Sequence, residues 1–188
     1  MKKSTIAKLL IIGTACAGFS SAFAASTGQI EFKGDITADV CGIKGGSNNQ
    51  TVQLGSVSAK VLDAVGKQST GTDFTIELQD CSSSTLNGAT VKFTGVEDAD
   101  AAGLLKIADG AGAAKGVGIL VTDANGKPYS IGTAGEKITL TEGGNVLKFK
   151  AAYQATKADV KDGNGKVTAP GVVPGKANGT AMFTVDYD

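Results

Sequence analysis

The chain has 188 residues, and its 18 basic residues, all of them lysines, balance 18 aspartates and glutamates, while histidine is absent. Without histidine no Ser-His-Asp or Cys-His catalytic arrangement can form, and the lack of a basic excess argues against nucleic acid as a partner. The 27 glycines and the absence of tryptophan are typical of a turn-rich β protein.

The first 24 residues have the pattern of a secretory signal peptide. Lys2 and Lys3 precede a mostly apolar run from Leu9 to Ala17, and Ala22-Phe23-Ala24 supplies the small residues that signal peptidase reads. Because the apolar run is shorter than a membrane span requires, we expect cleavage after Ala24 and export. The remaining residues, 25–188, have the size of one domain.

The next segment, residues 30–40, shows the clearest strand pattern in the chain. Apolar residues or glycine alternate with polar residues, which places them on opposite faces of an extended strand. The apolar face consists of Ile30, Phe32, Gly34, Ile36, Ala38 and Val40.

Further short segments with strand character follow along the chain. They are residues 51–54, 73–81, 90–94, 117–122, 137–140, 145–153 and 180–187. Asn125-Gly126 predicts a hairpin, because both residues tolerate the positive φ of tight turns. We expect a long exposed loop over 156–175 and a short helix within 98–114. Many short strands at this spacing predict an all-β, antiparallel sandwich of the immunoglobulin type.

Two cysteines remain once the signal peptide, with Cys16, is removed. Cys41 and Cys81 form an even pair in an exported chain, which predicts a disulfide. A metal or redox pair is the alternative, but the sequence has no CxxC motif and no histidine to complete such a site.

Three features together resemble the major subunits of type 1-like chaperone-usher fimbriae. The first is the run from Gly28 to Ile36 that leads to Cys41. The second is the stretch Phe74–Cys81, and the third is the final segment Phe183–Asp188, with Tyr187 penultimate and Gly175 the fourteenth residue from the end.

The resemblance implies an incomplete sandwich that a donor strand from a neighbouring subunit completes. Residues 25–38 are then an amino-terminal donor extension and residues 39–188 the pilin domain. In such proteins a periplasmic chaperone first lends a strand to the open groove, an outer-membrane usher exports the subunit, and identical subunits join into a surface filament; this complementation is a well-known example of β-strand addition. No cofactor, metal or nucleic acid is implied.

The resemblance also assigns candidate site residues. Ile30, Phe32, Gly34, Ile36 and Ala38 are the donor side chains. Gly175, Phe183, Val185 and Tyr187 mark the groove and the strand that pairs with the chaperone. Gly34 is either a tolerated strand glycine or a point of close backbone approach.

Alternatives remain at two levels. Residues 30–40 could instead be the first strand of their own domain, since alternation is the same in both cases. The protein could also be a minor or adaptor pilin, or a carbohydrate-binding module. Asp162-Gly163-Asn164-Gly165 is weakly similar to a calcium loop, but the later glutamate is missing, so a solvated turn is expected there.

Overall fold

The structure is a computed structural model that describes residues 28–34, 36, 40–82 and 88–188. The chain divides into two units, residues 1–36 and residues 37–188. In the first unit, the described residues 28–34 and 36 form no regular secondary structure. The predicted signal peptide, residues 1–24, lies outside the described residues.

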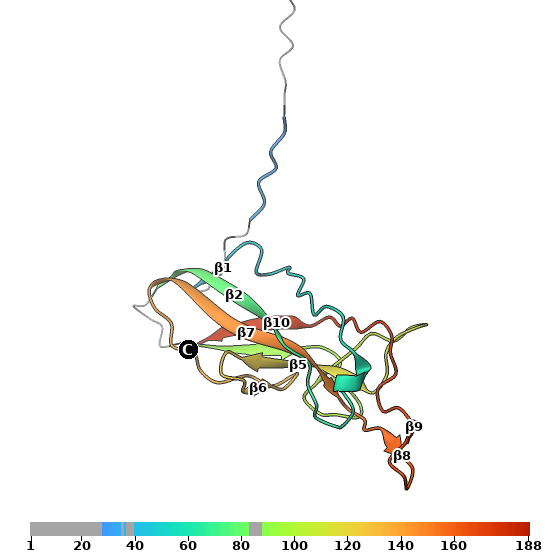
Figure 1. The fold of residues 1–188 in the computed structure, drawn as a ribbon. Coiled ribbons are helices and arrows are strands. Elements are labelled where there is room, and N and C mark those ends of the chain that lie inside the picture. Colours follow the sequence, from blue (N-terminus) through green and yellow to red (C-terminus); the bar gives the residue numbers. More distant parts are fainter. Residues whose placement is uncertain (1–27, 35, 37–39, 83–87) are drawn as a thin grey trace, which may run out of the picture. The chain divides into compact units, whose positions relative to one another are not determined.

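The main sheet of the second unit has the strand order β1–β2–β7–β5–β4, with β6 beside β5 (Figure 1). Its pairings are all antiparallel. The strands are β1 (Gly42–Ile43), β2 (Thr72–Cys81), β4 (Leu105–Lys106), β5 (Val117–Asp123), β6 (Pro128–Tyr129) and β7 (Gly143–Ala155). The one helical element among the described residues is a 3-10 turn, η1 (Ala59–Val61), capped by the Ser58 side chain.

A second sheet covers one face of the first. It pairs β3 (Ala89–Thr94) with β10 (Met182–Tyr187), and residues 132–138 run along the far side of β3 through hydrogen bonds from Gly132 N–H to Phe93 O (2.7 Å) and from Gly135 N–H to Val91 O (2.9 Å). Phe93 meets Phe149 of β7 edge-to-face with ring centroids 5.1 Å apart. This contact joins the two sheets across a common core, as in a β-sandwich, and it confirms the predicted all-β, antiparallel fold.

The hairpin predicted at Asn125-Gly126 joins β5 to β6. Gly126 has φ +86°, and the Asp123 carboxylate accepts hydrogen bonds from the backbone N–H groups of Asn125 and Lys127 (2.8 Å each). The same Asp-x-Asn-Gly-Lys sequence recurs at residues 162–166 and joins β8 (Val160–Lys161) to β9 (Val167–Ala169). The predicted loop 156–175 therefore contains a hairpin, which is exposed along its length.

Several sequence predictions differ from the structure, including the strand pattern of residues 30–40, whose described part in the first unit has no regular secondary structure. Residues 51–54 form no strand, residues 137–140 contribute only a bridge from Ile138 to Ala89, and residues 98–114 contain turns and β4 where a helix was expected. Residues 98–114 are rich in alanine, which favours helix, but Leu104, Leu105 and Ile107 within them are all buried. Tertiary packing has therefore overridden the local preference.

Candidate strand-acceptor surface

Strand β10 uses only one of its two edges for pairing. One edge pairs with β3 over six residue pairs, from Met182 opposite Thr94 to Tyr187 opposite Ala89. The other edge faces no strand within the described parts of the chain. We call this edge of β10, residues 182–187, the acceptor edge, because a strand edge with no neighbouring strand is a template for a further strand.

The side chains of β10 show that the core beneath it is incompletely covered. Phe183, Val185 and Tyr187 point inward yet are only half-buried, while the alternate residues of β10 are exposed. The paired inward residues of β3, Ala89, Val91 and Phe93, are at most 5% exposed. Since both strands lie in one sheet, the difference indicates that apolar surface is left open beside β10 and not beside β3.

A second extended stretch, residues 50–57, also has no strand partner in the described structure. Val52, Leu54 and Val57 are half-buried against the core, but no backbone–backbone hydrogen bond engages residues 50–57 among those described. Side chains make the links to β2 instead: Thr72 Oγ1 donates to Gln53 O (3.2 Å) and Gln50 Nε2 to Thr75 O (3.0 Å). This segment therefore has the side-chain pattern of a strand but lacks the backbone hydrogen bonds of a sheet in the described structure.

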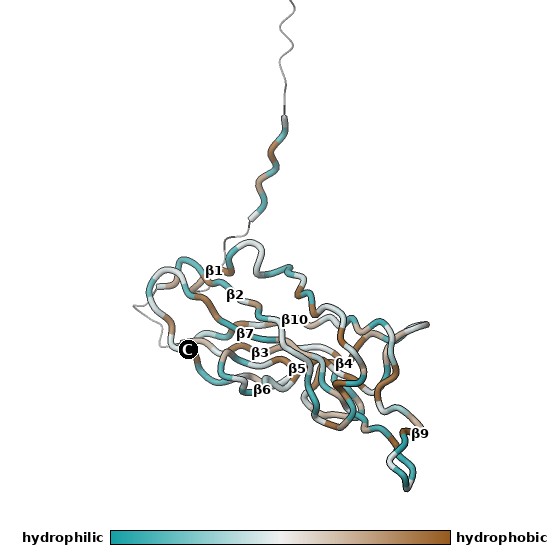
Figure 2. The backbone as a smooth tube through the Cα atoms, viewed as in Figure 1, coloured by the Kyte–Doolittle hydropathy of each residue, from teal (hydrophilic) through white to brown (hydrophobic). Residues whose placement is uncertain are grey.

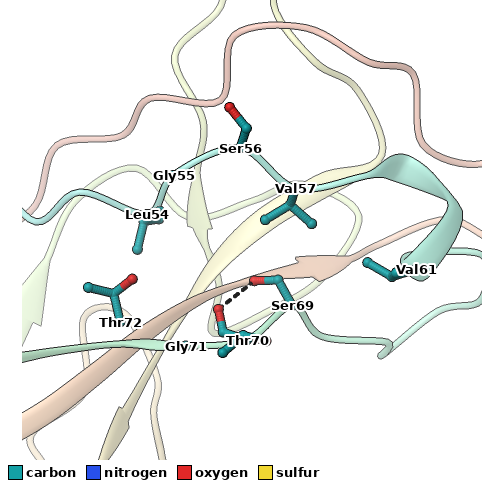
Figure 3. Close-up of a pocket in the computed structure, with 9 residues that line it drawn as sticks. All are labelled: Leu54, Gly55, Ser56, Val57, Val61, Ser69, Thr70, Gly71 and Thr72. Carbon is teal, nitrogen blue, oxygen red and sulfur yellow. Dashed lines mark hydrogen bonds between the residues drawn. The ribbon is translucent and has the colours of Figure 1, made fainter.

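An open hollow of about 370 Å³ separates the end of this segment from the start of β2 (Figure 3). Leu54, Val57 and Val61 form its apolar wall, and Ser69 and Thr70 contribute hydroxyls on the opposite side. The Ser69 hydroxyl donates to Thr70 O (3.1 Å). The hollow is thus a further place where apolar side chains of the sandwich remain uncovered.

The cysteines tie the start of the domain to the end of β2. The structure contains the Cys41–Cys81 disulfide, and both residues are 3% exposed. The Tyr187 hydroxyl donates to the carbonyl oxygen of Cys41 at 3.4 Å. The end of the acceptor edge therefore lies beside the point at which the amino-terminal segment joins the domain.

The amino-terminal segment itself presents large apolar side chains to solvent. Ile30, Phe32 and Ile36 are 77%, 88% and 104% exposed. Hydrophobic and hydrophilic residues alternate along it (Figure 2), and Glu31 and Lys33 on the polar face form an ion pair of 3.1 Å. Exposed apolar residues in such a row are expected to have a partner. Ala38 lies outside the described residues.

Gly175 lies seven residues before β10 and not on the acceptor edge itself. A Cβ atom at this position would stand 2.4 Å from Ala114 N and 2.5 Å from Ala113 C. Gly175 is therefore required where two backbones cross. The sequence pattern identified it, but this contact could not be predicted from the sequence.

Three exposed acidic side chains, one of them in the segment that is weakly similar to a calcium loop, are engaged in local structure. Glu97 accepts from the Gly103 N–H, Asp100 pairs with Lys157 (3.0 Å), and Asp162 accepts within its own turn. In the described part of the chain no three side chains are arranged to hold a metal ion. Nor does any helix there have the length and apolarity to cross a membrane.

Comparison with known proteins gives concordant matches. Residues 30–188 match the family described as "Fimbrial protein". The chain is 39% identical over 145 residues to the probable major fimbrial subunit LpfA of Escherichia coli O157:H7, covering 76% of this chain and 82% of that one. It is 32% identical to the type-1 fimbrial protein A chain of Escherichia coli K12, over the full length of both.

Solved structures give the same result. A subunit from a chaperone-usher pilus superposes with a TM-score of 0.70 at 26% identity, covering 88% of this chain and 98% of that one. The P pilus rod subunit PapA superposes with a TM-score of 0.60 at 25% identity, covering 80% of this chain and 100% of that one.

Proposed function

Because this chain belongs to the fimbrial protein family, we propose that it assembles by donor-strand exchange, with residues 25–38 of one subunit completing the sandwich of the next. It is a structural subunit of a fimbria: an exported protein that polymerises into the shaft on the cell surface. The relatives named as major subunits favour this role over a minor or adaptor pilin and over a carbohydrate-binding module.

The proposal rests mainly on the half-buried apolar side chains of β10. Phe183, Val185 and Tyr187 are only half-buried, and the described part of the chain places no strand on this side of β10. An added strand would bury them and also satisfy the backbone groups of that edge. The exposed row of Ile30, Phe32 and Ile36 is apolar at the same two-residue spacing and supplies matching side chains.

The position of Cys41 favours an antiparallel orientation of donor and β10. Each subunit's own extension ends three residues before Cys41, whose carbonyl oxygen accepts from Tyr187 at the end of β10. A donor parallel to β10 would bring the neighbouring domain to this same end, where it would compete with that extension for space. An antiparallel donor places the neighbouring domain at the Met182 end, so that subunits follow one another head to tail in an open filament.

Charge then disfavours two of the possible antiparallel registers. Pairing Ile30 with Val185 and Phe32 with Phe183 sets Glu31 opposite Thr184 on the outer face. Shifting the donor by two residues sets Glu31 opposite Asp186, and a further two sets Glu31 opposite Asp188. Since like charges directly opposite each other destabilise a sheet, we propose the first register, which also places Gly28 opposite Tyr187.

The partners before assembly follow from the same surface. We propose that a periplasmic chaperone covers the acceptor edge with a strand of its own until an outer-membrane usher passes the subunit on. The unpaired edge and its apolar row make such protection necessary, because an exposed apolar edge otherwise aggregates. A structural role accounts for these features without catalysis, and we propose none.

Cysteine cross-linking in assembled filaments tests the register. Ile30→Cys combined with Val185→Cys brings two thiols to directly opposite positions, within the Cα separation that a disulfide accepts. We expect a covalent ladder of subunits on non-reducing gels. The control pair, Ile30→Cys with Asp186→Cys, places the thiols on opposite faces of the sheet and should give no ladder; the reverse pattern would overturn the register.

A further inference from the structure

The segment that leads into β10 is bonded closely to the loop before β5. Lys115 and Val173 exchange backbone hydrogen bonds of 3.1 and 3.0 Å. The Ala114 N–H donates to Lys176 O (2.9 Å), and the Lys176 N–H donates to Gly112 O (2.8 Å). Residues 112–115 and 173–176 therefore run side by side as a short, irregular backbone pairing, which we call the clasp.

Two glycine contacts allow the backbones of this region to approach so closely. At Gly175 a Cβ would lie 2.4–2.6 Å from three backbone atoms of residues 112–114. At Gly116, which has φ +70°, a Cβ would lie 2.1 Å from Gly171 O. None of these neighbours is a flexible side chain that could move aside, so any substitution must shift the backbone.

Beyond the clasp, the chain stays anchored until it enters β10. Tyr153 of β7 donates its hydroxyl to Ala177 O (2.8 Å), and the Ala108 N–H donates to Asn178 O (2.7 Å). Strand β10 begins four residues later, at Met182. With a single strand partner in the described structure, β10 depends on this approach as well as on β3 for its register.

The register of β10 decides which of its side chains a donor strand would meet. A slip of one residue would turn Phe183 and Val185 outward and Thr184 and Asp186 inward, because side chains alternate between the faces. The acceptor edge would then offer polar groups to an incoming apolar strand. The affinity for the donor strand would therefore fall. The main sheet, whose strands pair with one another, would keep its contacts.

We infer that Gly175 is a positioning residue for strand acceptance: by letting residues 173–176 pair with residues 112–115, it fixes where β10 begins and which of its side chains face the donor. This inference rests on the proposed function, since it assumes that β10 is the acceptor. It assigns to Gly175 a role at a distance from the acceptor edge, through backbone geometry alone.

The test compares the full-length exported chain with Gly175→Ala and with the matched control Gly110→Ala. Gly110 lies in the same loop, has no atom within 4 Å of the place that a Cβ would occupy and has no positive φ. Two quantities are measured: the affinity for a synthetic peptide of residues 25–40, and the hydrogen exchange of amides in β10, β2 and β7. Tyr153→Phe, which removes one hydrogen bond to Ala177, serves as a milder variant should Gly175→Ala fail to fold.

We expect Gly175→Ala to bind the peptide about tenfold more weakly, as for a backbone shift that overpacking causes. Exchange should accelerate in β10 while β2 and β7 stay protected. Tyr153→Phe should act in the same direction more weakly, and Gly110→Ala should match the wild type. The inference would be overturned if the β10 amides of Gly175→Ala exchanged as slowly as those of the wild type. It would also be overturned if exchange accelerated equally in β10, β2 and β7. If the monomeric wild type, whose acceptor edge no neighbouring subunit occupies, ignores the peptide, the proposed function fails instead, and the exchange pattern still decides whether Gly175 positions β10.

Discussion

Asp80 shows how one residue can decide where a disulfide forms. Leu78 pairs with Asn145 and Cys81 with Gly143, so β2 has one residue more than β7 between these pairs, and Asp80 takes φ +54° in this bulge. Without the extra residue Cys81 would follow the alternation of Ile76 and Leu78 to the outer face. The bulge returns it to the core, where it bonds to Cys41.

The left-handed conformation at Asp80 makes its substitutions asymmetric. We expect Asp80→Val to lower the free energy of unfolding by about 1–2 kcal/mol, because a β-branched residue is strained at this φ. Asp80→Gly should leave stability within about 0.5 kcal/mol of the wild type, since glycine adopts such a φ freely. Urea denaturation measures both, and equal losses would show that the conformation is not the cause.

The disulfide should contribute a large share of the stability. Cys41 and Cys81 are 40 residues apart, and closing a loop of that length stabilises a fold by about 4 kcal/mol on the chain-entropy account. Cys81→Ser should therefore lower the unfolding midpoint in guanidinium strongly and reduce periplasmic yield. The reduced wild type should unfold at nearly the same midpoint as the variant; an unchanged midpoint in both would contradict a structural bridge.

Asp123 should make the β5–β6 turn sensitive to acid. Hydrogen bonds from the backbone N–H groups of Lys127 and Asn125 lower the pKa of this exposed carboxyl. Because the folded pKa lies below the unfolded one, the stabilisation is present above the ordinary pKa of about 3.9 and is lost as the pH falls through the folded value. Melting temperatures of the wild type should exceed those of Asp123→Asn at neutral pH and converge with them below about pH 4. A difference that is independent of pH would contradict this.

At the level of elements, alternation predicts the longer strands but not the two- and three-residue strands β1, β4, β8 and β9, and it does not reveal which segment lacks a partner. The alternation of Phe74, Ile76 and Leu78 predicts β2, and the structure has it. Residues 51–54 alternate as well, yet they form no strand in the structure, since a ladder needs a second backbone. Alternation indicates which side chains belong on a buried face. It does not indicate whether the strand that covers them comes from the same chain.

The two faces of β10 allow a direct test of the acceptor edge. Val185→Lys places a charge among apolar side chains that the donor should cover, whereas the neighbouring Thr184→Lys adds the same charge on the exposed face. We expect Val185→Lys to weaken binding of the residue 25–40 peptide by roughly two orders of magnitude. Thr184→Lys should leave binding unchanged or slightly tighter, because its charge lies opposite Glu31 in the proposed register. Titration by fluorescence anisotropy measures both. Similar losses in the two variants would mean that charge, and not the inward face, matters.

At the level of the whole molecule, the class of fold follows from the sequence, but the geometry of its open edge does not. Short alternating segments and Asn-Gly turns predict an antiparallel sandwich, and the sandwich is there. The bulge at Asp80, the crossing at Gly175 and the hollow beside Leu54 depend on contacts between distant segments. No local pattern specifies such contacts, because each requires two backbones to meet.

The central claim is that the domain lacks a strand that the segment 25–38 of another copy supplies. The most direct measurement is the thermal melting of the chain without residues 25–38, with and without the peptide of residues 25–40. A peptide present at a thousand times its dissociation constant adds about 4 kcal/mol, which in a domain of this size raises the melting temperature by about 10 °C. We predict such a rise, and none with a peptide carrying Ile30→Asp and Phe32→Asp. A truncated domain that is already stable and ignores both peptides would contradict the account.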